Sequence, residues 1–145
     1  KVPQNTEFSF SFNPEEIIRK YEKGTAPLAA RIAAVKTLIS RGYKVGLRFL
    51  PLLPVANYEN LYRELLRNLR AEIDFSKISS VFIASLIYNP GDFKQMQKKN
   101  PNSDLWSLVR QQDSGLVKID QPVWEHCLQI FAEELPGVKL YFDYI

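Results

Sequence analysis

The first segment with a clear pattern of hydrophobic and polar residues covers positions 7–12. Phenylalanine stands at every second position and serine stands between, which is the period-two alternation of a β-strand with two different faces. The residues that follow favour a short helix, because Asn13 suits an N-cap, Pro14 suits the first helical position and two acids fill the first turn. We expect that helix to end near Gly24, since glycine commonly forms the C-cap.

A helical period dominates the next segment. Its apolar residues recur three or four positions apart, at Leu28, Ile32, Val35 and Ile39. This spacing predicts the buried face of a helix, with Thr25 as its cap and Gly42 at its C-terminal end. Residues 43–50 then read as a strand buried on both faces, apart from Lys44 and Arg48.

Helical and strand-like segments continue to alternate along the rest of the chain. Helices are predicted over residues 57–71, 92–99, 104–110 and 121–135. Strands are predicted over residues 78–87, 114–119 and 138–144. Because alternating strands and helices build parallel sheets, the pattern predicts an α/β fold with a mostly parallel sheet.

Two of the predicted helices carry residues whose surroundings can be anticipated. In the helix over 57–71, the core side is expected to hold Tyr58, Leu61, Leu65 and Leu69, and the solvent side Arg63, Arg67 and Arg70. In the helix over 121–135, the inward residues are expected to be Val123, Cys127, Ile130 and Phe131. His126 and Cys127 are adjacent, so they point in different directions, and we expect a core thiol beside an exposed histidine rather than a nucleophile and its base.

Composition places further bounds on the protein. The chain has 145 residues, of which 46% are hydrophobic and 24% charged, which suits one domain with a real core. Its net charge of +3 favours an ordinary solvated surface, and it permits a nucleic-acid partner without requiring one. A single cysteine excludes an internal disulfide and fits a reducing, cytoplasmic compartment. The longest apolar run, residues 45–56, is too short and too broken to cross a membrane.

Several short motifs follow one another in a recognisable order. They are Phe10-Ser11-Phe12-Asn13, Gly24-Thr25, the run 31–34 that opens with Arg31, the run 42–46 between two glycines, Pro51, Tyr62 with Leu65, and Pro136-Gly137. In this order the chain resembles the C-terminal half of the radical-SAM barrel in the spore photoproduct lyase family. The resemblance covers nearly the whole chain and is most specific up to Pro51.

The resemblance implies a particular architecture. We expect a single domain over residues 1–145 that forms the C-terminal half of a partial (β/α) barrel. Its barrel strands and helices would lie in residues 1–88 and a C-terminal extension in residues 89–145. An open half-barrel leaves unpaired strand edges, so the expected partner is the missing N-terminal half-barrel or a second copy of the chain.

The resemblance also implies a reaction. In this family S-adenosylmethionine is cleaved reductively at a 4Fe-4S cluster, and the resulting deoxyadenosyl radical abstracts hydrogen from a thymine lesion in DNA. A cluster needs several thiolates, whereas this chain has one cysteine. We therefore expect the downstream part of a larger enzyme, either a fragment or one subunit of a split protein. No catalytic or metal-ligating residue is assigned to it, and alone it is expected to be inactive.

Three residues are candidates for binding the cofactor. The serine at this strand end contacts S-adenosylmethionine in the resembling family, which implies that role for Ser11, although the residue could equally fill space. Asn13 is the second candidate, with helix capping as its structural alternative. Arg48 is the third: it either lines the barrel mouth and meets a carboxylate or phosphate, or it pairs with a buried acid.

Arg31 and the strand over 78–87 complete this part of the analysis. For Arg31 we favour a structural role, either an ion pair with Glu15 or Glu16 or a brace on loop carbonyls. Family members tend to carry an acid and an arginine in the strand that corresponds to residues 81–88, and this chain has neither. That departure favours an alternative function, a non-catalytic module that docks a partner protein or nucleic acid.

A basic segment suggests where DNA would bind. The candidates are Lys94, Lys98, Lys99 and Lys118, with Trp106 as a stacking surface. In the resembling lyase the segment that holds the first three lies near DNA. The structural alternative is a solvated helix surface.

Overall fold

The protein has an α/β fold built on a parallel sheet. A computed structural model describes residues 5–143. Four strands pair in parallel in the spatial order β1-β2-β3-β7, with the bounds Glu7–Ser11, Lys44–Leu52, Ile78–Ser85 and Leu140–Asp143. The predicted fold class is therefore confirmed. The last predicted strand starts later than expected, and residue 144 lies outside the described residues.

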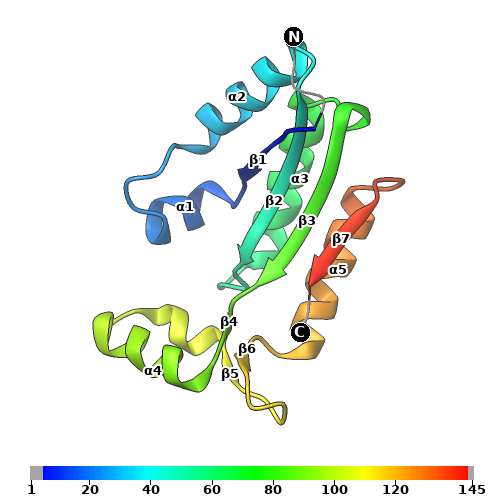
Figure 1. Ribbon diagram of the computed structural model, residues 1–145. Helices are drawn as coiled ribbons and strands as arrows, with labels where there is room; N and C mark the ends of the chain where they lie inside the picture. Colours follow the sequence, from blue (N-terminus) through cyan, green and yellow to red (C-terminus); the bar gives the residue numbers. More distant parts are fainter. Residues whose placement is uncertain (1–4, 144–145) are drawn as a thin grey trace.

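Helices connect these strands and cover one face of the sheet. They are α1 Glu15–Tyr21, α2 Leu28–Ser40, α3 Tyr58–Glu72 and α5 Gln121–Glu134, and a short 3-10 turn, η1, covers Phe75–Lys77. In Figure 1 the strands stand in front of α3 and α5, so the face toward the viewer carries no helix. On the covered side Phe131 of α5 packs against Phe49 and Tyr62, with ring centroids 4.8 and 5.9 Å apart.

The one-sided covering explains the burial of β2. Val45, Leu47 and Phe49 are completely buried against the helices, whereas Lys44 and Leu50, which alternate with them, are exposed. The expectation of a strand buried on both faces apart from Lys44 and Arg48 was wrong at Leu50, which is 37% exposed. Side chains of a strand alternate between the two faces, and only one face of this sheet has a covering layer.

A smaller unit follows the carboxyl end of β3. It comprises β4 Ile87–Tyr88, α4 Pro90–Lys99, the 3-10 helix η2 Asp104–Leu108, β5 Arg110–Gln111 and β6 Val117–Lys118. The three strands form an antiparallel sheet in the order β4-β6-β5. The arrowheads of β2 and β3 point toward this unit in Figure 1. After it the chain returns to the main sheet through α5 and β7, so the parallel sheet uses residues on both sides of position 88.

Local capping was predicted less well than the elements themselves. Helix α1 has Pro14 at its N-cap and helix α2 has Pro27, and neither has a side-chain cap, so the capping roles expected of Asn13 and Thr25 are wrong. Instead, the Leu28 backbone N–H at the start of α2 donates to the Glu15 carboxylate at 3.0 Å. Of the stripe predicted for α2, only Val35 is fully buried, while Leu28, Ile32 and Ile39 are partly exposed.

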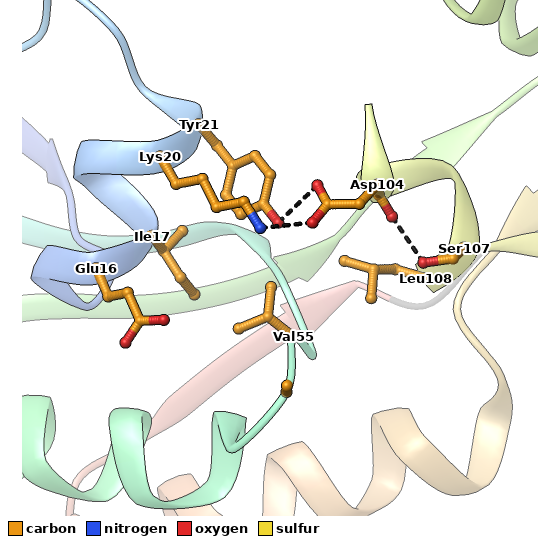
Figure 2. A pocket seen from close by; sticks show the side chains of 9 residues that line it. Glu16, Ile17, Lys20, Tyr21, Val55, Asp104, Ser107 and Leu108 are labelled. Carbon is orange, nitrogen blue, oxygen red and sulfur yellow. Dashed lines mark hydrogen bonds and ion pairs between the residues drawn. The ribbon is translucent and has the colours of Figure 1, made fainter. Parts of the chain in front are cut away.

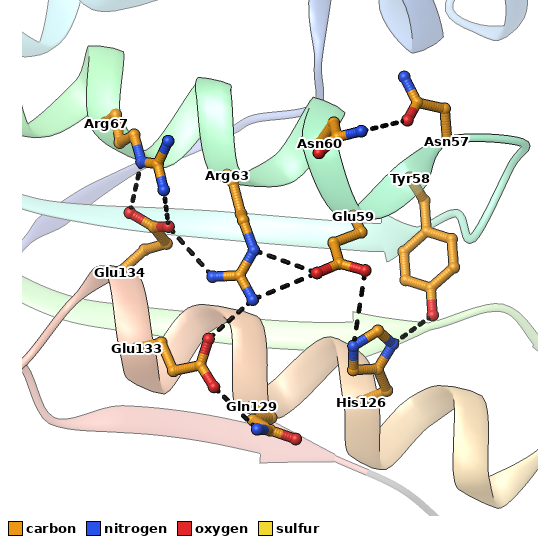
Figure 3. A network of polar contacts seen from close by, with 10 residues as sticks. All are labelled: Asn57, Tyr58, Glu59, Asn60, Arg63, Arg67, His126, Gln129, Glu133 and Glu134. Atoms are coloured by element: carbon orange, nitrogen blue, oxygen red, sulfur yellow. Dashed lines mark hydrogen bonds and ion pairs between the residues drawn. The ribbon is translucent and has the colours of Figure 1, made fainter.

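The arginines of α3 do not simply face solvent. Arg67 holds the Glu134 carboxylate of α5 through Nε at 3.0 Å and Nη2 at 2.7 Å, and Arg63 reaches the same carboxylate at 3.1 Å and Glu133 at 2.7 Å (Figure 3). Hydrogen bonds from Arg67 lower the pKa of Glu134 despite its partial burial. The sequence pattern missed these pairs because the two helices are distant in sequence.

None of the helices within residues 5–143 combines the length and apolar character that a membrane span needs.

Candidate functional site at the strand ends

Ligands of parallel α/β sheets bind at the carboxyl ends of the strands. A site is therefore expected at these ends, on the face of the sheet that no helix covers. The register places one row of residues across all four strands, at the carboxyl end of β1, in the middle of β2 and β3, and near the start of β7. The row consists of Ser11, Arg48, Phe82 and Tyr141. It combines a hydroxyl, a guanidinium and two aromatic rings on the face that no helix covers.

Ser11 lies at the end of β1 and is exposed. Within residues 5–143 its hydroxyl makes no hydrogen bond, whereas its backbone carbonyl accepts one from Arg31 Nη1 at 2.9 Å. Because Ser11 shares the face of Glu7 and Ser9, its side chain projects from the uncovered side of the sheet. The hydroxyl is therefore able to bind a molecule that occupies this face.

Arg48 is paired with Ser11 in register, but its head points elsewhere. Its Nη1 donates to Ser80 Oγ at 2.8 Å and its Nη2 pairs with the Glu7 carboxylate. Glu7 and Ser80 stand nearer the amino ends of their strands, so the guanidinium turns away from the carboxyl ends. Of the two interpretations left open for Arg48, this geometry matches the ion pair with an acid, although Glu7 is only partly buried.

Glu7 is the centre of this polar cluster. Its carboxylate accepts hydrogen bonds from Ser79 and Ser80 of β3, the latter at 3.0 Å, and pairs with Arg48 of β2. Burial acts to raise the pKa of Glu7, but the two serine hydrogen bonds and the Arg48 charge outweigh burial, and the pKa is lowered. Three strands are thus tied together on a face that has no hydrophobic layer.

Gly46 makes room for the cluster. A Cβ atom at this position would lie 2.5 Å from Glu7 Oε1 and 2.7 Å from both Arg48 Nη1 and Ser80 Oγ. Carbon and oxygen or nitrogen atoms do not approach so closely, so any larger residue here would move the ends of these side chains out of their present arrangement.

Behind Ser11 lies a buried polar network that includes Asn13. Asn13 is completely buried, and its Nδ2 donates to Glu22 Oε1 at 2.8 Å and to the Pro51 carbonyl at 3.3 Å. Its Oδ1 accepts a hydrogen bond from the Tyr62 hydroxyl at 2.9 Å, and that hydroxyl accepts one from the Leu53 backbone N–H at 3.0 Å. The side chain of Asn13 is therefore engaged within the protein on the covered side of the sheet.

Arg31 closes the other end of this network. It pairs with Glu22 at 2.6 Å and donates to the carbonyls of Ser11 and Ala26 at 2.9 and 2.8 Å. The predicted brace on carbonyls is confirmed, but neither of the predicted acids, Glu15 or Glu16, is its partner. Glu22 takes that place because the chain turns back after α1 and brings residue 22 beside the start of α2.

The candidate DNA-binding lysines fall into two groups. Lys94, Lys98 and Lys99 are exposed on α4. Lys118 lies on β6 and is 7% exposed. Three lysines of the four are therefore placed on a surface that a phosphate backbone can reach.

The rings near α4 form a cluster. Trp106 contacts Phe93 and Tyr88 edge-on, with ring centroids 5.6 and 6.5 Å apart, and its indole N–H donates to the Asn100 carbonyl at 2.7 Å. A cavity of about 690 Å³ lies beside this cluster, between η2 and the end of α1, and it is lined by Lys20 of α1, by Lys23 in the turn that follows α1, and by Trp106. Sequence reasoning missed Lys20 and Lys23, since nothing local brings residues 20 and 106 together.

Figure 2 shows a second cavity, of about 260 Å³. It has Lys20, Tyr21 and Asp104 in common with the lining of the first. Asp104 of η2 lines both cavities and accepts hydrogen bonds from Lys20 at 2.5 Å and from the Tyr21 hydroxyl at 3.0 Å. These two hydrogen bonds lower the pKa of Asp104. The contact attaches the small unit to the helix that follows the Ser11 strand.

No metal site is found in the part of the chain that the structure describes. Residues 5–143 contain no group of three or more His, Cys, Asp or Glu side chains able to hold a metal ion. Cys127 is buried, as predicted, and burial raises its pKa to about 12. The neighbouring His126 is partly exposed and lies 2.7 Å from the Tyr58 hydroxyl (Figure 3). The donor set does not fit an iron–sulfur cluster.

Comparison with known proteins gives a consistent answer. The family model described as spore photoproduct lyase matches residues 1–105. The chain is 35% identical over 68 residues to spore photoproduct lyase of Bacillus subtilis (strain 168), which is 47% of this chain and 20% of that protein. It is 31% identical over 86 residues to spore photoproduct lyase of Clostridium acetobutylicum, which is 56% of this chain and 26% of that protein. These matches thus cover about a fifth to a quarter of the relatives' length.

Solved structures share the fold. A cysteine-to-alanine mutant of spore photoproduct lyase superimposes with a TM-score of 0.74 at 21% identity, covering 95% of this chain and 45% of that chain. A mutant with bound AdoMet and dinucleoside spore photoproduct gives 0.70 at 20% identity, covering 97% and 44%. The chain therefore has the fold of one part, less than half, of these spore photoproduct lyase chains. The family match is more specific, and the chain belongs to the spore photoproduct lyase family.

Proposed function

We propose that this chain is the C-terminal portion of a radical-SAM DNA repair enzyme that acts on thymine lesions through a deoxyadenosyl radical. The family match over residues 1–105 supports the class of enzyme. Neighbouring structures are described with AdoMet and with dinucleoside spore photoproduct bound, which supports the classes of cofactor and substrate. The chain spans less than half of those neighbours, so the reaction belongs to a larger assembly.

Ser11 is our candidate contact for S-adenosylmethionine. When bound beside a reducing cluster, this cofactor supplies the radical that abstracts hydrogen. The exposed Ser11 hydroxyl lies at a strand end, has no partner within residues 5–143, and so is able to donate to a carboxylate or accept from an amine. Asn13 and Arg48, the other two candidates, support the strand end indirectly. The polar group of Asn13 binds Glu22, and that of Arg48 binds Glu7.

The cluster is assigned to the remaining half of the barrel. The one cysteine of this chain is a buried thiol on the covered side of the sheet, so no step of the reaction is derived through a metal here. The remaining half of the barrel is also the partner that we propose for the unpaired edge of β1. Among residues 5–143, β1 pairs only with β2.

DNA is the proposed substrate, and the small unit offers a basic surface for it. The exposed lysines of α4, together with Lys23, which lines the larger cavity beside Trp106, supply positive charge near the Trp106 cluster, whereas Lys20 is already paired with Asp104. Phosphates bind to such ammonium groups and bases stack on aromatic rings. Lys118 is left out of this surface because it is almost fully buried.

The observation that carries the proposal is the Ser11 hydroxyl, unpartnered within residues 5–143, at the carboxyl end of a strand in this family's fold. The test uses the full-length protein, reconstituted anaerobically, with S-adenosylmethionine affinity measured by calorimetry. Removing one hydrogen bond of about 1 kcal/mol predicts roughly a fivefold to tenfold weaker affinity for Ser11→Ala. Ser40→Ala, at the far end of α2, is the control and should bind normally.

The same preparation separates the two functions. Release of deoxyadenosine with damaged DNA supports the enzyme. If the cluster-loaded protein binds DNA but releases no deoxyadenosine, the enzyme hypothesis is rejected and the docking module is supported. Equal affinities of wild type and Ser11→Ala would remove Ser11 from the site.

A further inference from the structure

The backbone at Ser11 has an unusual hydrogen-bond partner. The Phe12 N–H donates to the Arg48 carbonyl at 2.7 Å, so this N–H points toward β2. Successive residues of a strand direct their N–H and C=O groups to opposite edges, so the Ser11 carbonyl faces the edge of β1 away from β2. At that edge no strand pairs with β1 within residues 5–143, and Arg31 Nη1 donates to the carbonyl at 2.9 Å.

Arg31 is itself held rigidly. Its Nε donates to the Ala26 carbonyl at 2.8 Å, and its Nη2 donates to Glu22 at 2.6 Å and to Thr25 Oγ1 at 2.8 Å. All three guanidinium nitrogens are engaged, and the residue is only 8% exposed. A planar guanidinium with every nitrogen bound has one orientation, so the Ser11 carbonyl has one as well.

The segment just after Ser11 is held by the same network. The Glu22 carboxylate that binds Arg31 also accepts from Asn13, and Asn13 in turn accepts from Tyr62. Both Asn13 and Tyr62 are almost completely buried on the covered side of the sheet. The network therefore reaches Ser11 only through its backbone, and none of its members is placed to touch a molecule on the uncovered face.

The geometry points to Arg31 as a positioning residue for the ligand bound at Ser11, a role that rests on the proposed function. Arg31 donates to the Ser11 carbonyl, which a further strand at this edge would need as its hydrogen-bond acceptor. Strand pairing along β1 must therefore stop before Ser11. The edge then opens where the Ser11 hydroxyl projects, and the fixed peptide aims that hydroxyl at the opening. Arg31 acts on the ligand through Ser11 and through no contact of its own.

A double-mutant cycle tests this role, with S-adenosylmethionine affinity of the reconstituted full-length protein as the readout. Arg31→Lys keeps the charge beside Glu22, but one ammonium cannot reach Ser11, Ala26 and Glu22 together. We expect Arg31→Lys to weaken affinity about tenfold when Ser11 is present and less than twofold in the Ser11→Ala background. Arg41→Lys, on an exposed arginine after α2, should leave affinity unchanged in both.

The outcomes are distinguishable. If Arg31→Lys weakens binding equally in both backgrounds, Arg31 does not act through Ser11 and the inference is overturned. If Ser11→Ala alone binds normally, Ser11 is not a contact of the cofactor, and both that assignment and the inference on Arg31 are overturned, whereas the enzyme itself is rejected only by a failure to release deoxyadenosine. Thr25→Val is the milder second variant, since it removes one acceptor of Arg31 from an exposed residue. It should weaken binding about threefold with Ser11 present and not at all without it; an equal effect in both would again overturn the inference.

Discussion

The Tyr62 hydroxyl donates to Asn13 Oδ1 at 2.9 Å and joins two residues that are 49 positions apart in the sequence. Asn13 follows the first strand of the sheet, and Tyr62 lies in the helix that follows the second. The bond links the two βα units directly behind the candidate site. Burial raises the pKa of Tyr62 far above its ordinary value, so the hydroxyl stays protonated and remains a donor throughout the range in which the protein is folded.

Tyr62→Phe should destabilise the protein by about 1–3 kcal/mol. The substitution leaves both the Asn13 oxygen and the Leu53 N–H without their partner in a buried place, and unsatisfied buried groups cost about that much. Urea unfolding followed by circular dichroism measures the change. Tyr43→Phe, on a partly exposed ring, is the matched control. A Tyr62→Phe effect no larger than that of the control would contradict the importance of the network.

Gly46→Ala should be more harmful than alanine at another glycine. The new methyl group would displace the polar ends of Glu7, Arg48 and Ser80 from one another, and the lost hydrogen bonding costs about 1 kcal/mol. Gly91→Ala is the control, because nothing lies within 4 Å of a Cβ there. The two free energies of unfolding are compared directly. Equal effects would mean that the Glu7 cluster does not occupy the space beside Gly46 in solution.

Stability should fall in acid in a way that depends on Glu7. The pKa of Glu7 in the folded protein is below its ordinary value of 4.5, so the unfolded chain takes up a proton first as the pH falls. The stabilisation is therefore complete above about pH 4.5 and is lost progressively as the pH drops toward the lowered folded pKa. Unfolding free energies of wild type and Glu7→Gln, measured from about pH 7 to about pH 3, should converge at the acid end. If the two free energies of unfolding differ by the same amount at every pH, the acid sensitivity does not come from Glu7.

The lysines of the basic surface should contribute to DNA affinity independently of base sequence. Lys98→Gln and Lys23→Gln are each expected to weaken binding of the full-length protein and to lower the salt slope by roughly 0.9 per phosphate that the variant no longer neutralises. Fluorescence anisotropy over a range of salt concentrations gives both quantities. Lys36→Gln, which removes an exposed lysine that pairs with Glu72, is the control. A salt slope unchanged by either test variant would show that this surface does not bind DNA.

Much of the fold could be read from local patterns. The phenylalanine alternation before Asn13 predicted β1, and the helical spacings and glycines predicted the main helices within a few residues. Such patterns work because a strand or helix repeats the same geometry at each residue. The burial of Lys118 could not be predicted, because it depends on how β6 is covered after folding and not on its neighbours in sequence.

The site shows the same division. Motif order by itself identified Ser11, Asn13, Arg31 and Tyr62 as residues worth attention, and it indicated the family to which the chain belongs. It did not reveal that Glu22 joins Arg31 to Asn13, or that Glu7 holds Arg48 away from the strand ends. A hydrogen-bond partner is chosen by distance in space, and distance is set by which strands lie side by side and how the chain turns between them. The sequence alone determined the elements and their order. The packing of those elements decided which polar groups bind one another and which, like the Ser11 hydroxyl among residues 5–143, are left to face a ligand.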